Sequence, residues 1–196
     1  MAYGLNNYDK EEKILVYDLG GGTFDVSILE MFEGILDVKS SRGNDRLGGK
    51  DFDSRIEKYI EKEFEKTYNQ NLYKGLDVKN KLSIKLRVKE AAINAKKELS
   101  TQLSTTINIP FITIIDNKPV SIGMELTRDK FNQLTKDLVI STTEKIDEAL
   151  KAAKLKEKDI DRVLLIGGSS RIPAVKELVE KKFKGKIITG INPDEA

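Results

Sequence analysis

The chain has 196 residues, 39% hydrophobic and 34% charged, and this length allows one sizeable core or two small ones. Thirty-four basic and thirty-two acidic residues leave a net charge of +2, so we expect no nucleic-acid partner. The lack of cysteine and histidine excludes disulfides, the usual zinc sites and histidine-dependent catalysis. No apolar run approaches the roughly 20 residues that span a bilayer, so we expect no membrane partner. We expect the protein to be located in the cytoplasm, with an organellar matrix as the alternative.

The stretch from Ile14 to Leu29 predicts a strand, a glycine turn and a second strand. Residues 14–17 form an apolar run typical of a strand that is buried on both faces. The glycines at 20–22 allow turn conformations that bring backbone N–H groups close to a ligand. After the turn, polar and apolar residues alternate, which predicts one core face and one polar face. The polar face carries Thr23, Asp25 and Ser27.

This turn has two possible interpretations. In the first, its glycines only form the turn of a β-hairpin; in the second, their N–H groups bind phosphate oxygens. The surrounding groups favour phosphate, because Thr23 offers a hydroxyl while Asp18 and Asp25 are suited to hold Mg²⁺ through water. Neither the GxxxxGK[ST] nor the GxGxxG pattern fits, since a strand instead of a helix follows the glycines.

The next part of the chain changes from strand to helix patterns. A third strand is predicted over 35–40, and from Asp51 the apolar residues recur at helical spacing. The buried positions of this helix are then Phe52, Ile56, Tyr59, Ile60 and Phe64. A polar loop over 69–80 leads to a second helix over 82–100. Its buried stripe is Val88, Ala92, Ala95 and Leu99.

A hairpin and a long helix follow. Two strands over 106–115 and 120–126 are joined by a predicted turn over 116–119. Thr127 is expected to cap a helix that reaches Ala153. The mixture of hairpins and helices indicates an α/β protein with two subdomains, one inserted into the other.

A strand, turn and helix near the end of the chain form a second candidate anion site. A short buried strand over 162–166 precedes the glycines at 167–168. We expect Ser169 or Ser170 to cap the helix that follows, with Pro173 in its first turn. A helix N-terminus attracts anions through its free N–H groups. The alternative is an ordinary capped turn.

The second helix has a face that carries lysines. Ile93, Lys96, Lys97 and Ser100 follow i, i+3, i+4, i+7 spacing and therefore lie together. Such a face is usually solvated surface, and the residues alone do not favour another role.

Several motifs together resemble one family. The string VYDLGGGTFDVSI resembles the second phosphate loop of the seventy-kilodalton heat-shock chaperones, the DnaK-type ATPases. LGGKDFDSRI, LIGGSSRIPAV and INPDEA follow in the family's order, and the similarity covers essentially the whole chain. The resemblance implies the second lobe of an actin-like (ribonuclease H-like) ATPase fold, a β-sheet flanked by helices. Residues 1–47 and 136–196 would form its core subdomain, and 48–135 an inserted α+β subdomain.

The resemblance also implies roles for individual residues. Thr23, Asp18 and Asp25 form the expected catalytic group, and the two aspartates hold Mg²⁺ through water. The phosphates of ATP or ADP lie on the first glycine turn, and the purine lies against the guanidinium of Arg171. Gly49 allows close approach of the nucleotide or serves only as an interdomain turn. The expected nucleotide-binding set is Gly20, Gly21, Gly22, Thr23, Gly49, Lys96, Lys97, Ser100, Gly167, Gly168, Ser169, Arg171 and Asp194.

Two residues depart from the family pattern. Ile93 stands where the family typically carries glutamate, and an isoleucine side chain accepts no hydrogen bond from a ribose hydroxyl. Lys50 stands where an acidic residue is usual.

We therefore expect a fragment of an ATP-dependent chaperone whose parent hydrolyses ATP to control peptide binding. The implied partners are unfolded client peptides through a separate domain, a J-domain co-chaperone, and a nucleotide-exchange factor on the inserted subdomain. Without the family's first lobe, we expect nucleotide binding to be weaker by at least about a thousand-fold and turnover to be lost. The alternatives are another actin-like ATPase or sugar kinase, or an exchange-factor-binding module whose nucleotide contacts have decayed.

Overall fold

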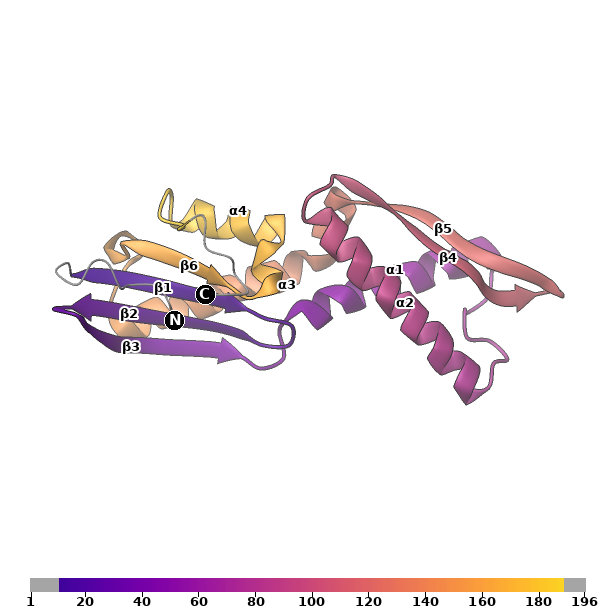
Figure 1. Ribbon diagram of the computed structural model, residues 1–196, viewed down its shortest axis with the longest axis horizontal. Coiled ribbons are helices and arrows are strands. Elements are labelled where there is room, and N and C mark those ends of the chain that lie inside the picture. The colour runs from indigo at the N-terminus through magenta and orange to yellow at the C-terminus, as the bar shows by residue number, and fades with distance from the viewer. Residues whose placement is uncertain (1–10, 189–196) are drawn as a thin grey trace. The chain divides into compact units, whose positions relative to one another are not determined.

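The computed structural model describes residues 11–188, which divide into two compact units (Figure 1). The sheet unit comprises residues 1–50 and 137–196, so far as these are described, and the hairpin unit comprises residues 51–136. Both divisions fall inside helices, the first near the start of α1 (Gly49–Tyr68) and the second within α3 (Arg128–Ala153). The chain is an α/β protein in which the hairpin unit interrupts the sequence of the sheet unit.

The sheet unit is built on four strands in the order β3-β2-β1-β6. The central strand β1 (Glu12–Leu19) pairs antiparallel with β2 (Phe24–Phe32) and parallel with β6 (Arg162–Ile166). Strand β3 (Ile35–Asn44) lies at the edge beside β2. Residues 14–17 are each at most 7% exposed, which confirms the predicted burial of β1 on both faces.

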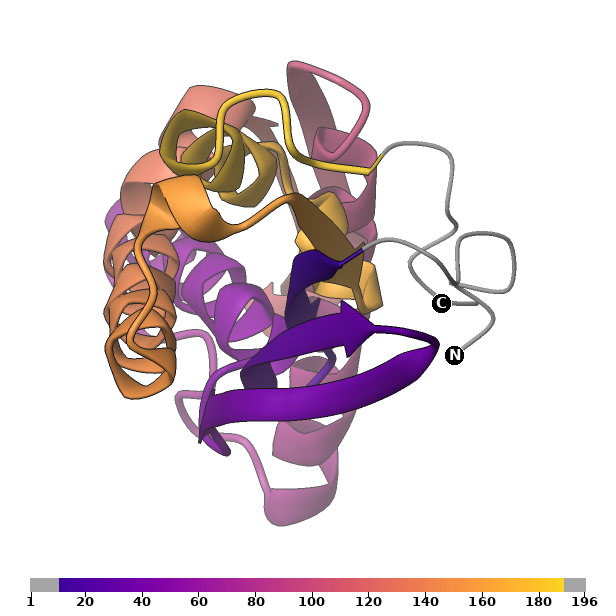
Figure 2. The same cartoon turned by 90° about the vertical axis from the view of Figure 1, so that its left-hand side faces the viewer.

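Helices cover one face of this sheet (Figure 2). Ser40 on β3 donates a hydrogen bond from Oγ to the Ala149 carbonyl on α3 at 2.9 Å. Helix α4 (Pro173–Lys182) lies beside α3, because Lys182 Nζ contacts Asp147 Oδ1 at 2.8 Å. Alternation places the fully buried Leu15, Tyr17, Phe24, Val26 and Ile28 on this face. The opposite face carries a smaller buried cluster, namely Ile14, Val16, Leu29 and Leu164.

The hairpin unit has its own core between α1, α2 (Val78–Leu99) and the β4–β5 hairpin. Strands β4 (Ser104–Ile115) and β5 (Lys118–Thr127) pair antiparallel. The Phe52 and Phe131 rings lie 6.3 Å apart, between α1 and the start of α3. Helix α1 buries Phe52, Ile56, Ile60 and Phe64 as predicted, whereas Tyr59 is only half-buried. Helix α2 buries Ile84, Val88, Ala92, Ala95 and Leu99, which confirms its stripe and adds one residue.

The hairpin turn is shorter than predicted. Asp116 and Asn117 alone form it, with φ values of +50° and +60°, while Lys118 and Pro119 already pair within β5. Two consecutive left-handed residues give a type I′ turn, whose twist matches that of the strands. The predicted four-residue turn is therefore wrong.

Two helix starts test the predicted boundaries. The loop over 69–80 ends early, because the Asp77 side chain accepts a hydrogen bond from Asn80 N at 2.7 Å and caps α2. The predicted cap of α3 is confirmed, since Thr127 Oγ1 accepts a hydrogen bond from Lys130 N at 3.2 Å. Among residues 11–188, no helix combines the length and apolar content needed to cross a membrane.

We expect Ile56→Ala to lower the free energy of unfolding by about 2–5 kcal/mol, because it leaves a cavity in the hairpin unit's core. Urea denaturation followed by circular dichroism measures this change. Lys58→Ala, at an exposed position of α1, should change stability by less than about 0.5 kcal/mol. Equal effects from the two variants would contradict the assignment of this core.

Candidate functional site

Two glycine turns leave the sheet at the same edge. Strands β1 and β6 are parallel and in register from Ile14 beside Arg162 to Asp18 beside Ile166. The first glycine turn, residues 20–23, follows β1, and the second, residues 167–168, follows β6. In open α/β sheets, ligands bind outside the carboxyl ends of the strands.

Backbone hydrogen bonds hold the first glycine turn against the start of α1. Gly20 N donates to Thr23 O at 3.0 Å, while Gly49 N donates to Gly20 O and Lys50 N to Gly21 O, both at 2.9 Å. The turn's carbonyls therefore face α1. Within residues 11–188, the N–H groups of Gly21 and Gly22 donate no hydrogen bond to the backbone, which makes them suitable anion donors.

Gly48 permits this close approach and was not predicted. A Cβ on Gly48 would lie 2.5 Å from the backbone N and Cα of Gly22, closer than real Cβ atoms come to such atoms. The sequence signal for Gly48 is the pair of adjacent glycines in LGG, of which only Gly49 was predicted to lie near the nucleotide. The nucleotide contact expected of Gly49 stays a prediction.

The second glycine turn packs directly on the first. Gly167 has a φ of +81°, and a Cβ there would overlap the Leu19 carbonyl. The buried Ser169 donates from Oγ to Gly20 O at 3.1 Å, across 149 residues of sequence. This bond and the shared sheet edge bring together the two motifs that the sequence singled out.

The expected serine cap of α4 is wrong. A 3-10 turn, η2 (Gly168–Arg171), precedes the helix, and its N-cap is Ile172 with no capping side chain. Ser170 Oγ donates to Gly167 O at 2.7 Å, and Ser169 bonds to the first glycine turn. Both hydroxyls stabilise the two turns instead of the helix.

Asp18 and Asp25 lie opposite each other across the β1–β2 pair. Partial burial raises the pKa of Asp18, and the nearby charge of Asp25 raises it further. The pair therefore favours a neighbouring cation. Among residues 11–188, no three acidic, histidine or cysteine side chains gather as a metal site. Two carboxylates fit Mg²⁺, which keeps several waters and takes further oxygens from phosphates.

The predicted residues of α2 lie in the hairpin unit. Lys96 Nζ contacts Asp53 Oδ1 on α1 at 2.7 Å, and both side chains are largely buried. Ser100 Oγ donates to Lys96 O at 3.2 Å, while Lys97 is exposed. Asp53 was not predicted, although the DFD motif contains it. Helix packing thus gives Lys96 a carboxylate partner within its own unit.

The remaining predicted residues are on the surface or outside the described range. Gly168, in the second glycine turn, and Arg171, at the end of η2, are both exposed. Asp194 lies outside the described residues.

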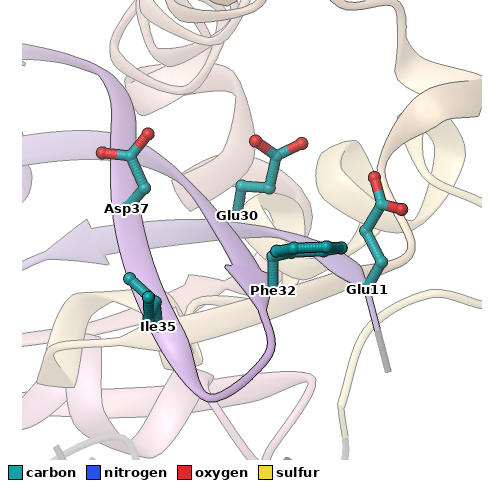
Figure 3. A pocket seen from close by; sticks show the side chains of 5 residues that line it. All are labelled: Glu11, Glu30, Phe32, Ile35 and Asp37. Carbon is teal, nitrogen blue, oxygen red and sulfur yellow. The ribbon is translucent and has the colours of Figure 1, made fainter. Parts of the chain in front are cut away.

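A separate hollow lies toward the far end of β1 and β2 from the glycine turns. Figure 3 shows Glu30 and Phe32 on β2, Ile35 and Asp37 on β3, and Glu11 before β1. The Lys39 ammonium contacts the Glu30 carboxylate at 2.8 Å and lowers the pKa of that group. Three carboxylates make this hollow unsuited to a phosphate.

The fold is thus that of an α/β protein with two glycine turns at the carboxyl edge of its sheet, beside two carboxylates. The family model described as Hsp70 protein matches residues 1–196, the whole chain. The chain therefore belongs to the Hsp70 family, which confirms the resemblance seen in its motifs. This is a family of chaperone-type ATPases with the actin-like fold, and its members bind nucleotide and Mg²⁺ and act with client peptides and co-chaperones.

We expect Gly48→Ala to lower the free energy of unfolding by about 1–3 kcal/mol, because the added methyl group meets rigid backbone of Gly22. Thermal and urea denaturation measure this loss. Gly21→Ala is the matched control, since nothing lies within 4 Å of its Cβ position. A Gly48 variant as stable as the Gly21 variant would contradict the contact.

We expect Asp18→Asn to raise stability near pH 7 by less than about 1 kcal/mol. Because the pKa of Asp18 is raised in the folded state, the ionised carboxylate destabilises the folded state at pH values above that raised pKa. This destabilisation vanishes below the ordinary aspartate pKa of about 3.9, where Asp18 is protonated in both the folded and the unfolded states. Urea denaturation at about pH 7 and about pH 3 should thus show a gain only at the higher pH. Asp45→Asn, at an exposed site, controls for net charge. A loss of stability near pH 7 would contradict the prediction.

Proposed function

We propose that this chain is the second lobe of an actin-like ATPase domain and binds ATP or ADP with Mg²⁺ at the two glycine turns. In this proposal, residues 1–47 and 136–196 form the core subdomain and 48–135 the inserted subdomain. The observation that carries it is the hydrogen bond from Ser169 Oγ to Gly20 O, which joins the two turns at one sheet edge. Membership of the Hsp70 family supports the choice of ligand.

The first glycine turn would bind the β- and γ-phosphates. The N–H groups of Gly21 and Gly22 and the exposed Thr23 hydroxyl are the donors, with Gly20 shaping the turn. Asp18 and Asp25 would hold Mg²⁺ through water, and the ion would neutralise charge on the phosphates. Phosphoryl transfer to water depends mainly on positioning and electrostatics, which these groups supply.

The second glycine turn would border the adenosine. Gly167 and Gly168 present backbone at the surface of the turn, and the Arg171 guanidinium is suited to lie flat on a purine. Ser169 would act by holding the two turns together, since its hydroxyl already donates to Gly20 O. The nucleotide contacts expected of Lys96, Lys97, Ser100 and Asp194 stay predictions.

The wider proposal concerns the complete chaperone. ATP hydrolysis would control the binding of unfolded client peptides by a separate domain. A J-domain co-chaperone would stimulate the cycle, and a nucleotide-exchange factor would bind residues 48–135. These partners rest on family membership.

We expect the 196 residues alone to bind MgADP at least about a thousand-fold more weakly than the complete ATPase domain. A hydrogen bond to a charged group contributes about 1.5–3 kcal/mol, and three or four of them would come from the other lobe. Calorimetric titration of both proteins measures the difference. Micromolar or tighter binding by the chain alone would contradict this expectation.

Gly21→Val in the complete domain is the companion test. Nothing lies within 4 Å of the Cβ position of Gly21, and the added methyl groups would cover the donors of the first glycine turn, so nucleotide affinity should fall. Gly123→Val on β5 is the matched control, because its Cβ position is equally open. Unchanged nucleotide affinity in the Gly21 variant would contradict phosphate binding at this turn.

A further inference from the structure

Lys50 places a positive charge beside the first glycine turn. Its Nζ lies 3.8 Å from the point that a Cβ on Gly22 would occupy, and the residue is exposed. Among residues 11–188, the Lys50 ammonium forms no ion pair, and neither Asp18 nor Asp25 neutralises it. An unneutralised ammonium next to a glycine turn is an electrostatic attraction for an anion.

The backbone of Lys50 is fixed to the same turn. Lys50 N donates to Gly21 O, and Gly49 N donates to Gly20 O, so these first N–H groups of α1 are already used within the chain. The attraction for an anion at this point therefore comes from the lysine side chain. The backbone of Lys50 is therefore anchored at Gly21, and its ammonium lies on the Cβ side of the adjacent Gly22.

Donors of two kinds thus meet at one place. The N–H groups of Gly21 and Gly22 have no backbone partner among the described residues, and the Lys50 ammonium lies near Gly22, 3.8 Å from its Cβ position. Phosphate oxygens accept hydrogen bonds from both kinds of donor, and contacts with a charged donor are the stronger ones. A carboxylate ligand would offer two oxygens, whereas a terminal phosphate offers three.

We propose that Lys50 is a further phosphate-binding residue of this site, whose ammonium contacts the phosphate group held by the N–H groups of Gly21 and Gly22. The inference rests on the proposed function and adds a residue to it. Its ligand is the terminal phosphate of a nucleotide or a free phosphate anion, since both present the same oxygens.

The test is an NMR titration of the ¹⁵N-labelled 196-residue chain with inorganic triphosphate at low ionic strength. The amide signals of Gly21 and Gly22 should shift in the wild type. Lys50→Glu should raise the dissociation constant by about tenfold or more, with Lys50→Gln in between. Lys58→Glu, the same charge change at an exposed position of α1, should raise it by less than about twofold. Added salt should reduce the difference in dissociation constant between the wild type and Lys50→Glu, because salt screens the charge of the lysine.

Two results of the triphosphate titration would overturn the inference. One is a wild type whose Gly21 and Gly22 signals do not respond to triphosphate. The other is equal weakening by Lys50→Glu and Lys58→Glu, which would indicate only net charge. Parallel titrations with MgADP and adenosine separate this inference from the proposed function. Triphosphate binding that depends on Lys50, with no response to adenosine, would support the role of Lys50 and reject the adenosine site. MgADP binding that is unaffected by Lys50→Glu would support the nucleotide site and reject the role of Lys50.

Discussion

The site depends on two carbonyl groups, those of Gly20 and Gly21. They accept hydrogen bonds from Gly49 N, Lys50 N and Ser169 Oγ, donors that come from two other parts of the chain. A glycine-rich turn alone would sample many conformations, because glycine restricts its backbone least. Here the acceptors are fixed from one side, and the N–H groups of Gly21 and Gly22 have no backbone partner among the described residues. The bonds that stabilise the turn therefore use its carbonyls and leave these two donors, which is the geometry that the proposed phosphate contact requires.

The sheet beneath the turns gives them a rigid base. Strand β1 is buried on both faces and paired on both edges, so the residue that precedes the first turn, Leu19, has little freedom. Strand β6 is in register with β1, and the second turn is therefore placed by backbone pairing before any side chain contributes. Ser169 then adds one hydrogen bond to an arrangement that the sheet has already made.

Local patterns predicted most of the fold, whereas contacts between distant parts of the chain account for the site features that were missed. The apolar run at 14–17 and the helical stripes depend on burial alone, and the structure confirms them. The serines at 169 and 170 were expected to cap a helix, but the carbonyl that Ser169 binds lies 149 residues away. No local pattern identifies such a partner. The same holds for Gly48 against Gly22 and for Asp53 against Lys96, where the residue types were visible and their neighbours were not. The nucleotide roles of the motif residues stay predictions.

The position of β3 bears on how the protein behaves at high concentration. In the described part of the chain β3 is an edge strand, and Ile35, Leu36 and Val38 are 69%, 50% and 60% exposed. An exposed edge with apolar side chains is a template on which a strand of another molecule adds. Lys39 and Arg42 interrupt this edge with charge, which is how natural sheets discourage such pairing. Charged side chains of β3 therefore oppose self-association through this edge, a property separate from the glycine turns.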